Sequence, residues 1–423
     1  MPIIVPEDSG NATIIEDSDI QNIRIRIRPD NASAHQQFFN FTLAGEPGAT
    51  FKINIEGANE VSYPGWTDKG GSYRATASCD DETWSRLSTT YNPETGILSI
   101  EGQLTDTSLN IAFFASYPYK RHLELIREAS TIPNSTVRVL GKTKEDRDIT
   151  LLTIGEPGPD KKNIYVLARQ HPGETMAEWF AEGLIMSLEE QPSEFFDHAV
   201  LYIVPNMNPD GSYHGNLRTN AQGKDLNREW DNYDNEVDAP EVFYVRREIL
   251  KTGAALVLDI HGDETNPHVF PEGRGLGCTE NPEMNELERE FISEYQKRAP
   301  YLKSESCYEP DEPGKANLGM AVKFFAERLG CLSMLFEMPN KELASGEDWT
   351  QQHCKTFGSF LVPTLIPLLS KLNNKRLEHA GIARGLSFLI DQKTTQPEVQ
   401  QAEIVEQEQT ALAIDSPGCC IIT

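Results

Sequence analysis

Two histidines and two glutamates in this sequence have the side-chain chemistry of a catalytic metal site. His171 and Glu174 stand three residues apart after an apolar run. His261 follows a second apolar run, and Glu337 ends a third. Two imidazoles and a carboxylate suit zinc, which in catalytic sites takes three protein ligands and keeps a fourth position for water. We therefore predict that His171, Glu174 and His261 bind one zinc ion. A carboxylate beside such a metal, here Glu337, can take a proton from water and return it to a leaving amine.

The stretch NLRTNAQGKDLNREW, residues 216–230, adds two arginines and an amide. Arg218 could stabilise an oxyanion. Arg228, with Asn227 beside it, could bind a carboxylate through a bidentate hydrogen bond. Each polar residue taken alone also fits an ordinary role, such as an acid in the first turn of a helix at Glu174. Their common position along the chain is what favours a functional site.

Four apolar runs with the character of buried strands carry these residues at their C-terminal ends. The runs are 163–168, 199–205, 255–260 and 331–337, and longer helical patterns lie between them. Alternation of this kind is typical of an α/β domain with a mixed, largely parallel sheet flanked by helices. In open α/β sheets, ligands bind outside the carboxyl ends of the strands. The four sets of polar side chains are therefore expected to form one site.

The composition of the chain changes twice. Residues 1–118 contain short runs with period-two alternation, such as NIRIRIRP, separated by turn clusters, and this pattern predicts an antiparallel β-sandwich domain. Residues 119–374 are expected to form the α/β domain. Residues 375–423 are polar and free of aromatic side chains after the apolar stretch that ends near residue 390, and we predict a disordered C-terminal tail.

The motifs HPGE, NPDGSYHGNLRTNAQGKDLNREW, DIHGDE and FEMP together resemble the zinc carboxypeptidases of the M14 type. The resemblance is strongest to the cytosolic carboxypeptidase subfamily, including its bacterial members. The block GN-R…G-DLNR-W and a β domain ahead of the α/β domain are both traits of that subfamily. The resemblance covers roughly residues 20–370.

The resemblance implies the same roles as the residue chemistry. His171, Glu174 and His261 become zinc ligands, and Glu337 becomes the general base and acid. Arg218 would polarise the scissile carbonyl, while Asn227 and Arg228 would bind the terminal carboxylate of the substrate. HGDE at residues 261–264 replaces the HGHS of animal members, which weakens any transfer of their substrates to this chain. The family often has a tyrosine that closes over the substrate, and Tyr308 is a candidate for it.

The expected function is a zinc metallocarboxypeptidase that hydrolyses the C-terminal peptide bond of peptides or protein tails. Animal members of the subfamily shorten glutamate tails, so the resemblance implies an acidic substrate. Arg274 and Lys315 lie in predicted loops that could supply a selecting cation, although both also fit solvated surface charges. A zinc-dependent deacylase of N-acyl amino acids and a non-catalytic binding module remain open as alternatives. Comparing activity on a panel of N-acyl amino acids with activity on peptides distinguishes the deacylase from the peptidase. Bound zinc without turnover would indicate the binding module.

The formal net charge of −27 argues against nucleic acid as a partner, because nucleic-acid binding needs a basic face. No apolar stretch is long enough to span a bilayer, and the N-terminus lacks the pattern of a signal peptide. The seven cysteines are scattered and odd in number, which suits a reducing compartment. The sequence therefore predicts a cytoplasmic protein.

The last residues, CCIIT, form a C-a-a-X pattern on Cys420, directly after Cys419. Prenylation of Cys420, with acylation of Cys419, would attach the protein peripherally to a membrane. Bacteria are not expected to prenylate, so for a bacterial source this modification would imply delivery into a eukaryotic host. Equal solubility of the wild type and the Cys420→Ser variant in eukaryotic cells would contradict this hypothesis.

Overall fold

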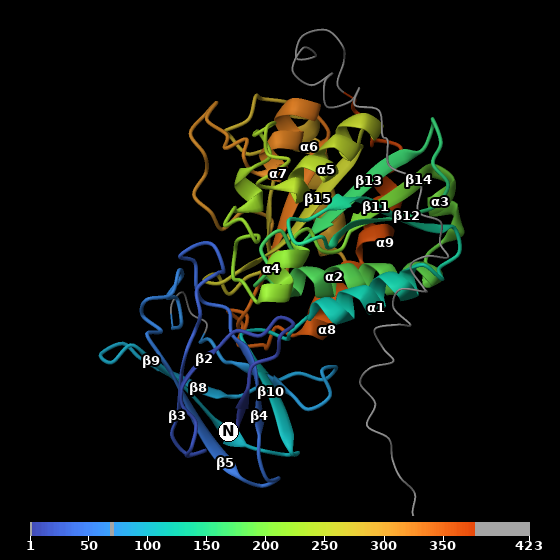
Figure 1. Cartoon of the computed structure of the whole chain (residues 1–423). Coiled ribbons are helices and arrows are strands. Elements are labelled where there is room, and N and C mark those ends of the chain that lie inside the picture. The colour runs from blue at the N-terminus through green and yellow to red at the C-terminus, as the bar shows by residue number, and fades with distance from the viewer. Residues whose placement is uncertain (1, 68–71, 377–423) are drawn as a thin grey trace, which may run out of the picture.

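The computed structural model describes residues 2–67 and 72–376. Figure 1 shows a β domain from the N-terminal part of the chain, coloured blue, below a larger α/β domain coloured from cyan to red. Cys419 and Cys420 lie outside the described residues. Within the described residues, no helix is long and apolar enough to cross a bilayer, and none of the five cysteines forms a disulfide.

The N-terminal domain consists of two five-stranded sheets that enclose one apolar core. The first sheet has the order β1-β4-β10-β6-β7: β1 (Ile3–Ile4), β4 (Asn40–Ala44), β10 (Ser108–Ala112), β6 (Thr76–Ser78) and β7 (Ser85–Arg86). The second has the order β2-β3-β5-β9-β8: β2 (Thr13–Glu16), β3 (Ile23–Arg26), β5 (Thr50–Glu56), β9 (Ile97–Gln103) and β8 (Ser88–Asn92).

The alternating pattern of the sequence explains how these sheets bury their inner faces. In β3, Ile23 and Ile25 are fully buried while Arg24 and Arg26 are exposed, because successive side chains of a strand point to opposite faces. The prediction of an antiparallel β domain is confirmed, with one exception: β3 and β5 pair in parallel.

A seven-stranded mixed sheet forms the centre of the α/β domain, which confirms the predicted fold class. Its order is β11-β12-β14-β13-β15-β17-β16. The four strands β14, β13, β15 and β17 run parallel. Strands β12 and β16 pair antiparallel with β14 and β17, and the edge strand β11 pairs antiparallel with β12. The bounds are β11 (Ser135–Lys142), β12 (Asp148–Ile154), β14 (Ala199–Val204), β13 (Lys162–Ala168), β15 (Leu256–Asp263), β17 (Leu332–Pro339) and β16 (Phe270–Glu272).

Helices cover both faces of this sheet (Figure 1). One face packs against α1 (Tyr119–Ala129), α2 (Thr175–Met186), α6 (Pro282–Gln296), α8 (Gln351–Ser359) and α9 (Leu361–Leu365). The other packs against α5 (Pro240–Thr252) and α7 (Ala321–Phe324). The remaining helices of the described residues are short: α3 (Ser193–His198), α4 (Pro209–His214), the 3-10 turns Leu188–Glu190, Leu226–Arg228 and Ile366–Leu368, and the π-helical turn Phe325–Leu329. Because both faces are covered, the central strands are buried along their whole length, except for the half-buried Lys162 at the start of β13.

Helices α2 and α8 cross at two glycines. A Cβ atom on Gly183 of α2 would overlap the carbonyl of Lys355, and one on Gly358 of α8 would overlap the carbonyl of Phe180. Since neither glycine carries a side chain, the two backbones approach closely. This contact fixes the helix that starts directly after Glu174.

The two domains share packing and hydrogen bonds. Phe114 and Tyr117, which follow the last strand of the β domain, lie in the same apolar core as Trp179 of α2. Asp8 accepts hydrogen bonds from the backbone N–H groups of Tyr119 and Lys120, both at 2.8 Å, at the start of α1. The β domain is therefore joined to the α/β domain by more than the connecting chain.

Candidate active site

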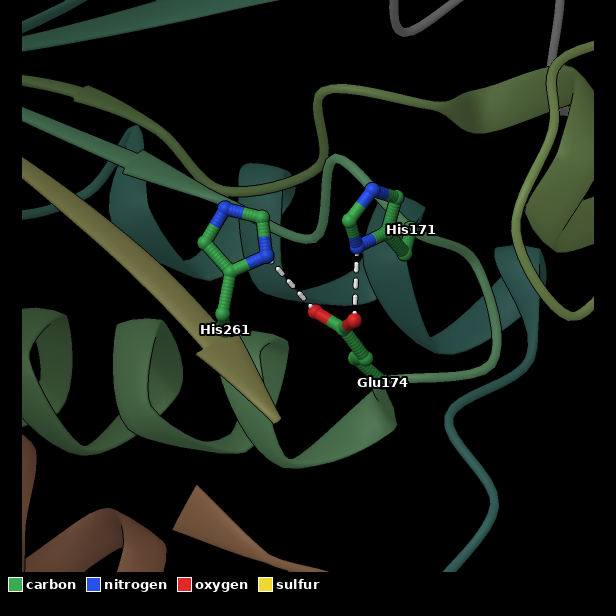
Figure 2. Close-up of side chains that lie close together, drawn as sticks. All are labelled: His171, Glu174 and His261. Carbon is green, nitrogen blue, oxygen red and sulfur yellow. Dashed lines mark hydrogen bonds and ion pairs between the residues drawn. The ribbon is translucent and has the colours of Figure 1, made fainter. Parts of the chain in front are cut away.

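His171, Glu174 and His261 come together at the carboxyl edge of the parallel strands. His171 lies in the loop after β13, Glu174 stands immediately before α2, and His261 is near the end of β15. Figure 2 shows both imidazole rings turned toward the Glu174 carboxylate. His171 Nδ1 is 2.6 Å from Glu174 Oε1, and His261 Nδ1 is 2.8 Å from Glu174 Oε2. The three side chains are buried, and one ligand atom from each lies within 4.8 Å of the other two.

A carboxylate backs each histidine on the side away from this cluster. His171 Nε2 is 2.9 Å from Asp225 Oδ1, and His261 Nε2 is 3.0 Å from Asp259 Oδ2. Metal-ligating histidines commonly make such a second contact, which fixes the ring and raises its basicity as a ligand. Both rings are therefore held with Nδ1 facing the centre of the cluster.

The charges of the cluster fit a divalent cation. Burial opposes ionisation of Glu174, but His171 and His261 outweigh it and lower the pKa of Glu174 below its ordinary 4.5. Burial likewise opposes a charge on His261, but Asp259 and Glu174 raise the pKa of His261 well above 6.5. Buried carboxylates thus surround the two imidazoles, and a cation is the partner that such a site favours. Two nitrogens and one oxygen are the ligand set of a catalytic zinc site.

Glu337 lies on β17 directly beside His261, because the two residues are register partners in the parallel pair β15–β17. The hydroxyl of Tyr308 donates a hydrogen bond of 2.8 Å to Glu337 Oε1. Glu337 Oε2 is buried and has no hydrogen-bond partner among the described residues. Burial raises the pKa of Glu337 well above 4.5, against the lowering effect of His261. Glu337 is thus a buried acid with one free oxygen.

Tyr308 reaches the site from the loop between α6 and α7, with its ring packed edge-on against Phe270 at 5.0 Å between centroids. Its hydroxyl also lies 3.1 Å from Asp263 Oδ2. Asp263 is the third residue of the HGDE stretch, where the sequence departs from animal members. The structure therefore places the candidate tyrosine at Glu337.

Arg218 lies beside the cluster of His171, Glu174 and His261 and is joined to it through Asp225. Its Nε donates a hydrogen bond of 2.8 Å to Asp225 Oδ2, and Asp225 Oδ1 contacts His171. Burial would lower the pKa of Arg218, but the Asp225 carboxylate raises it above its ordinary value. Arg218 is therefore a fixed positive charge next to His171.

Asn227 is buried and Arg228 is exposed. The Asn227 amide nitrogen is 3.3 Å from His261 Nε2, and its oxygen accepts a hydrogen bond of 2.9 Å from the backbone N–H of Ala321. Arg228 donates to the Asn227 carbonyl at 2.7 Å. The structure thus brings Asn227 to the cluster, and Arg228 beside it is exposed.

The two candidate cations for substrate selection differ in environment. Lys315 is exposed and pairs with Glu312. Arg274 is only 3 % exposed, and its interpretation as a solvated surface charge is wrong. Its Nη2 donates to the Thr279 carbonyl at 2.6 Å. Its Nε and Nη1 have no hydrogen-bond partner among the described residues. An arginine buried in this way has guanidinium donors left for an anion.

Asp225 and Asp259 are not among the residues predicted from the sequence, although the sequence holds a signal for each. Asp259 precedes His261 by two residues on one strand, so both side chains point to the same face. Asp225 belongs to the DLNR block, from which the sequence predicts a role only for Asn227 and Arg228. Tyr63 was missed without any such signal: it comes from the β domain, and its ring lies 5.8 Å from the Arg218 guanidinium carbon.

Comparisons with known proteins agree with this geometry. The family model described as "Cytosolic carboxypeptidase N-terminal domain" matches residues 5–114, and the one described as "Zinc carboxypeptidase" matches residues 123–348. An uncharacterized protein of Zymomonas mobilis is 35 % identical over 375 residues, which cover 86 % of this chain and 96 % of that protein. Mouse cytosolic carboxypeptidase 6 is 36 % identical over 149 residues, which cover 32 % of this chain and only 27 % of the mouse protein.

Two solved bacterial structures share the whole architecture. A metallo-carboxypeptidase from Pseudomonas aeruginosa, in complex with (2-guanidinoethylmercapto)succinic acid, is 36 % identical with a TM-score of 0.81, covering 88 % of this chain and 100 % of that one. A metallo-carboxypeptidase from Burkholderia cenocepacia is 34 % identical with a TM-score of 0.80, covering 87 % and 98 %. The chain belongs to the zinc carboxypeptidase family, with the N-terminal domain of the cytosolic carboxypeptidases, and is a metallopeptidase that hydrolyses peptide bonds.

Proposed function

We propose that this enzyme removes C-terminal residues, with a preference for glutamate, from peptides or protein tails. In this proposal His171, Glu174 and His261 hold a single zinc ion. The observation that carries it is the convergence of these three side chains with Glu337 as their direct neighbour on β17. The domains would divide at residues 118 and 119, where α1 begins.

Glu337 is the proposed general base and acid. Zinc, when bound, supplies a Lewis acid that polarises the scissile carbonyl and lowers the pKa of water. Glu337 would take a proton from the attacking water and deliver it to the leaving nitrogen. The Tyr308 hydroxyl holds Oε1 and leaves the unpartnered Oε2 to accept the proton. A base held by one oxygen keeps its orientation through both proton transfers.

The two arginines bind different groups of the substrate, namely the scissile carbonyl and the terminal carboxylate. Arg218, kept cationic by Asp225, stabilises the negative charge that develops on the carbonyl oxygen. Arg228, which is exposed, binds the terminal carboxylate with Asn227. The ligand of the Pseudomonas aeruginosa relative joins a succinic acid to a guanidinoethyl arm, and its carboxylates need cationic groups to receive them.

Arg274 is the proposed selector for an acidic side chain. Phe270, at the start of β16, is the register partner of Glu337, and β16 runs from there toward the amino end of β17. Arg274, two residues beyond β16, therefore lies deeper along the sheet than Glu337. Its buried Nε and Nη1 lack partners among the described residues, and a substrate carboxylate would satisfy them. Burying a charge without hydrogen bonds is costly, so binding of an acidic residue relieves that cost.

The proposal is tested with the purified, zinc-loaded protein and a peptide that ends in several glutamates. Wild type should release free glutamate, and Glu337→Gln should reduce kcat by at least about 1,000-fold while zinc content stays unchanged. Arg274→Gln should lower kcat/KM for a C-terminal glutamate more than for a C-terminal alanine. The matched control is Lys315→Gln, an exposed cation of the neighbouring loop, which should change neither substrate.

Release of acyl groups from N-acyl amino acids without any peptide cleavage would favour the deacylase. Zinc binding with no turnover on either class would favour a non-catalytic module. Cytoplasmic location and lipid attachment at Cys420 and Cys419 stay predictions from the sequence.

A further inference from the structure

The loop between α4 and the 3-10 turn at Leu226–Arg228 carries Arg218 and Asp225, and it lies against the N-terminal domain. Backbone groups at its start bind side chains of that domain. The Gly215 carbonyl accepts a hydrogen bond of 2.8 Å from Asn11, and the His214 carbonyl accepts one of 2.5 Å from Arg28. The loop is thus anchored across the domain boundary before it reaches Arg218.

Asp30 makes the most concentrated of these contacts. Its Oδ1 accepts a hydrogen bond of 2.6 Å from the backbone N–H of Leu217. Its Oδ2 accepts three: from the N–H of Arg218 at 3.0 Å, and from the N–H and hydroxyl of Thr219 at 2.8 and 2.9 Å. The side chain of Asp30 is 4 % exposed. One buried carboxylate therefore fixes three successive residues with Arg218 at their centre.

The Arg218 side chain is held from two directions. Its Nε binds Asp225, and the ring of Tyr63 from the N-terminal domain lies 5.8 Å from its guanidinium carbon. The backbone therefore depends on Asp30, and the guanidinium depends on Asp225 and Tyr63. Two of these three contacts come from the N-terminal domain.

We propose that the N-terminal domain is part of the catalytic apparatus, with Asp30 acting as a positioning residue for Arg218. The inference rests on the proposed function, in which Arg218 stabilises developing charge on the carbonyl oxygen. A charge that acts in the transition state must be placed accurately, and a displacement of about 1 Å can cost about 100-fold in rate. Loss of the Asp30 carboxylate releases three N–H donors and lets the loop shift.

The test compares Asp30→Asn and Asp30→Ala with Asp8→Asn and Asp8→Ala. Asp8 is a matched control, because it also accepts two backbone N–H bonds across the domain boundary, but at α1. Both Asp30 variants should lower kcat by about 10- to 100-fold with KM changed by less than about threefold. Both Asp8 variants should keep the wild-type kcat per zinc-loaded chain, whatever stability they lose.

A double-mutant cycle separates positioning of Arg218 from a general structural effect. If Asp30 acts through Arg218, adding Asp30→Ala to Arg218→Ala should cause no further loss of kcat. Multiplying losses would overturn the inference, as would an Asp30→Ala enzyme with wild-type kcat per bound zinc. Counting turnover per bound zinc keeps the result valid if part of a variant preparation is unfolded.

The two proposals fail in different ways. A wild type that binds zinc and cleaves no peptide contradicts the proposed function. A wild type that cleaves peptides, with Asp30 variants as active as the Asp8 variants, contradicts only the role of Asp30.

Discussion

At the scale of single residues, Glu241 gives the clearest link between a buried charge and pH. This glutamate in the first turn of α5 is fully buried, and Asn220 donates a hydrogen bond of 3.2 Å to its Oε2. Burial raises the pKa of Glu241 from 4.5 to about 8. Because the folded state binds the proton more tightly than the unfolded state, this proton stabilises the fold fully below pH 4.5.

Stability contributed by Glu241 should be lost as the pH rises from 4.5 through about 8. Wild type should lose up to about 1.4 kcal/mol of unfolding free energy per pH unit in this window, relative to Glu241→Gln. Urea unfolding of both proteins at about pH 5.5 and about pH 7.5 measures the difference. Parallel pH dependence of the two proteins would show that Glu241 carries no raised pKa.

The residues of the site differ in how far the sequence could reveal them. His171 and Glu174 can be recognised in the sequence, because their three-residue spacing is typical of a loop-to-helix junction. Tyr308 could only be a candidate, since its place beside Glu337 depends on the path of the loop after α6. Asp30 lies 187 residues from Leu217, whose N–H it binds. A local sequence pattern cannot predict a contact between residues so far apart in the chain.

At the scale of elements, the crossing of α2 and α8 controls the position of Glu174. Gly183→Ala should destabilise the protein by about 1–3 kcal/mol or more, because the new Cβ overlaps the Lys355 carbonyl. This loss outweighs the gain of about 1 kcal/mol that alanine brings to a helix. Thermal unfolding measures the change, and zinc affinity should fall with it because α2 starts next to Glu174. Thr356→Ala, at an exposed position of α8, is the control and should stay within about 0.5 kcal/mol.

Element types were largely predictable, while their partners were not. Period-two alternation identified β3, and continuous apolar runs identified β13, β14, β15 and β17. The sequence could not reveal the parallel pairing of β3 with β5, because alternation fixes which face is buried and not which strand lies alongside. The antiparallel strand β16, with only three residues, is too short to show a pattern.

At the scale of the whole molecule, the two domains should unfold together. Phe114 and Tyr117 share the core of α2, and Arg86 of β7 donates hydrogen bonds to the carbonyls of Asn340 and Trp349 at 2.9 and 2.8 Å. We expect a single cooperative thermal transition by circular dichroism and by tryptophan fluorescence. Two separated transitions would mean that the shared core contributes little.

Zinc binding should raise the Tm of this single transition, and both domains should show the same increase. A free zinc concentration of about 100 times Kd adds about 2.7 kcal/mol to the free energy of unfolding, so a chelator should lower Tm for both domains at once. His261→Ala should remove most of the shift, since it deletes one of the three proposed ligands. A chelator effect that persists in His261→Ala would place the stabilising metal elsewhere.

The pairing of His261 on β15 with Glu337 on β17 has a consequence for the order of synthesis. A ribosome releases His171, Glu174 and His261 well before Glu337, which lies 76 positions after His261 in the chain. The growing polypeptide can thus bring the proposed metal ligands together while the proposed proton acceptor is still untranslated. In this proposal the protein can hydrolyse peptides only after the strand Leu332–Pro339, which carries Glu337, has joined the sheet. A truncated product ending before that strand would be a zinc-binding protein without the proposed base.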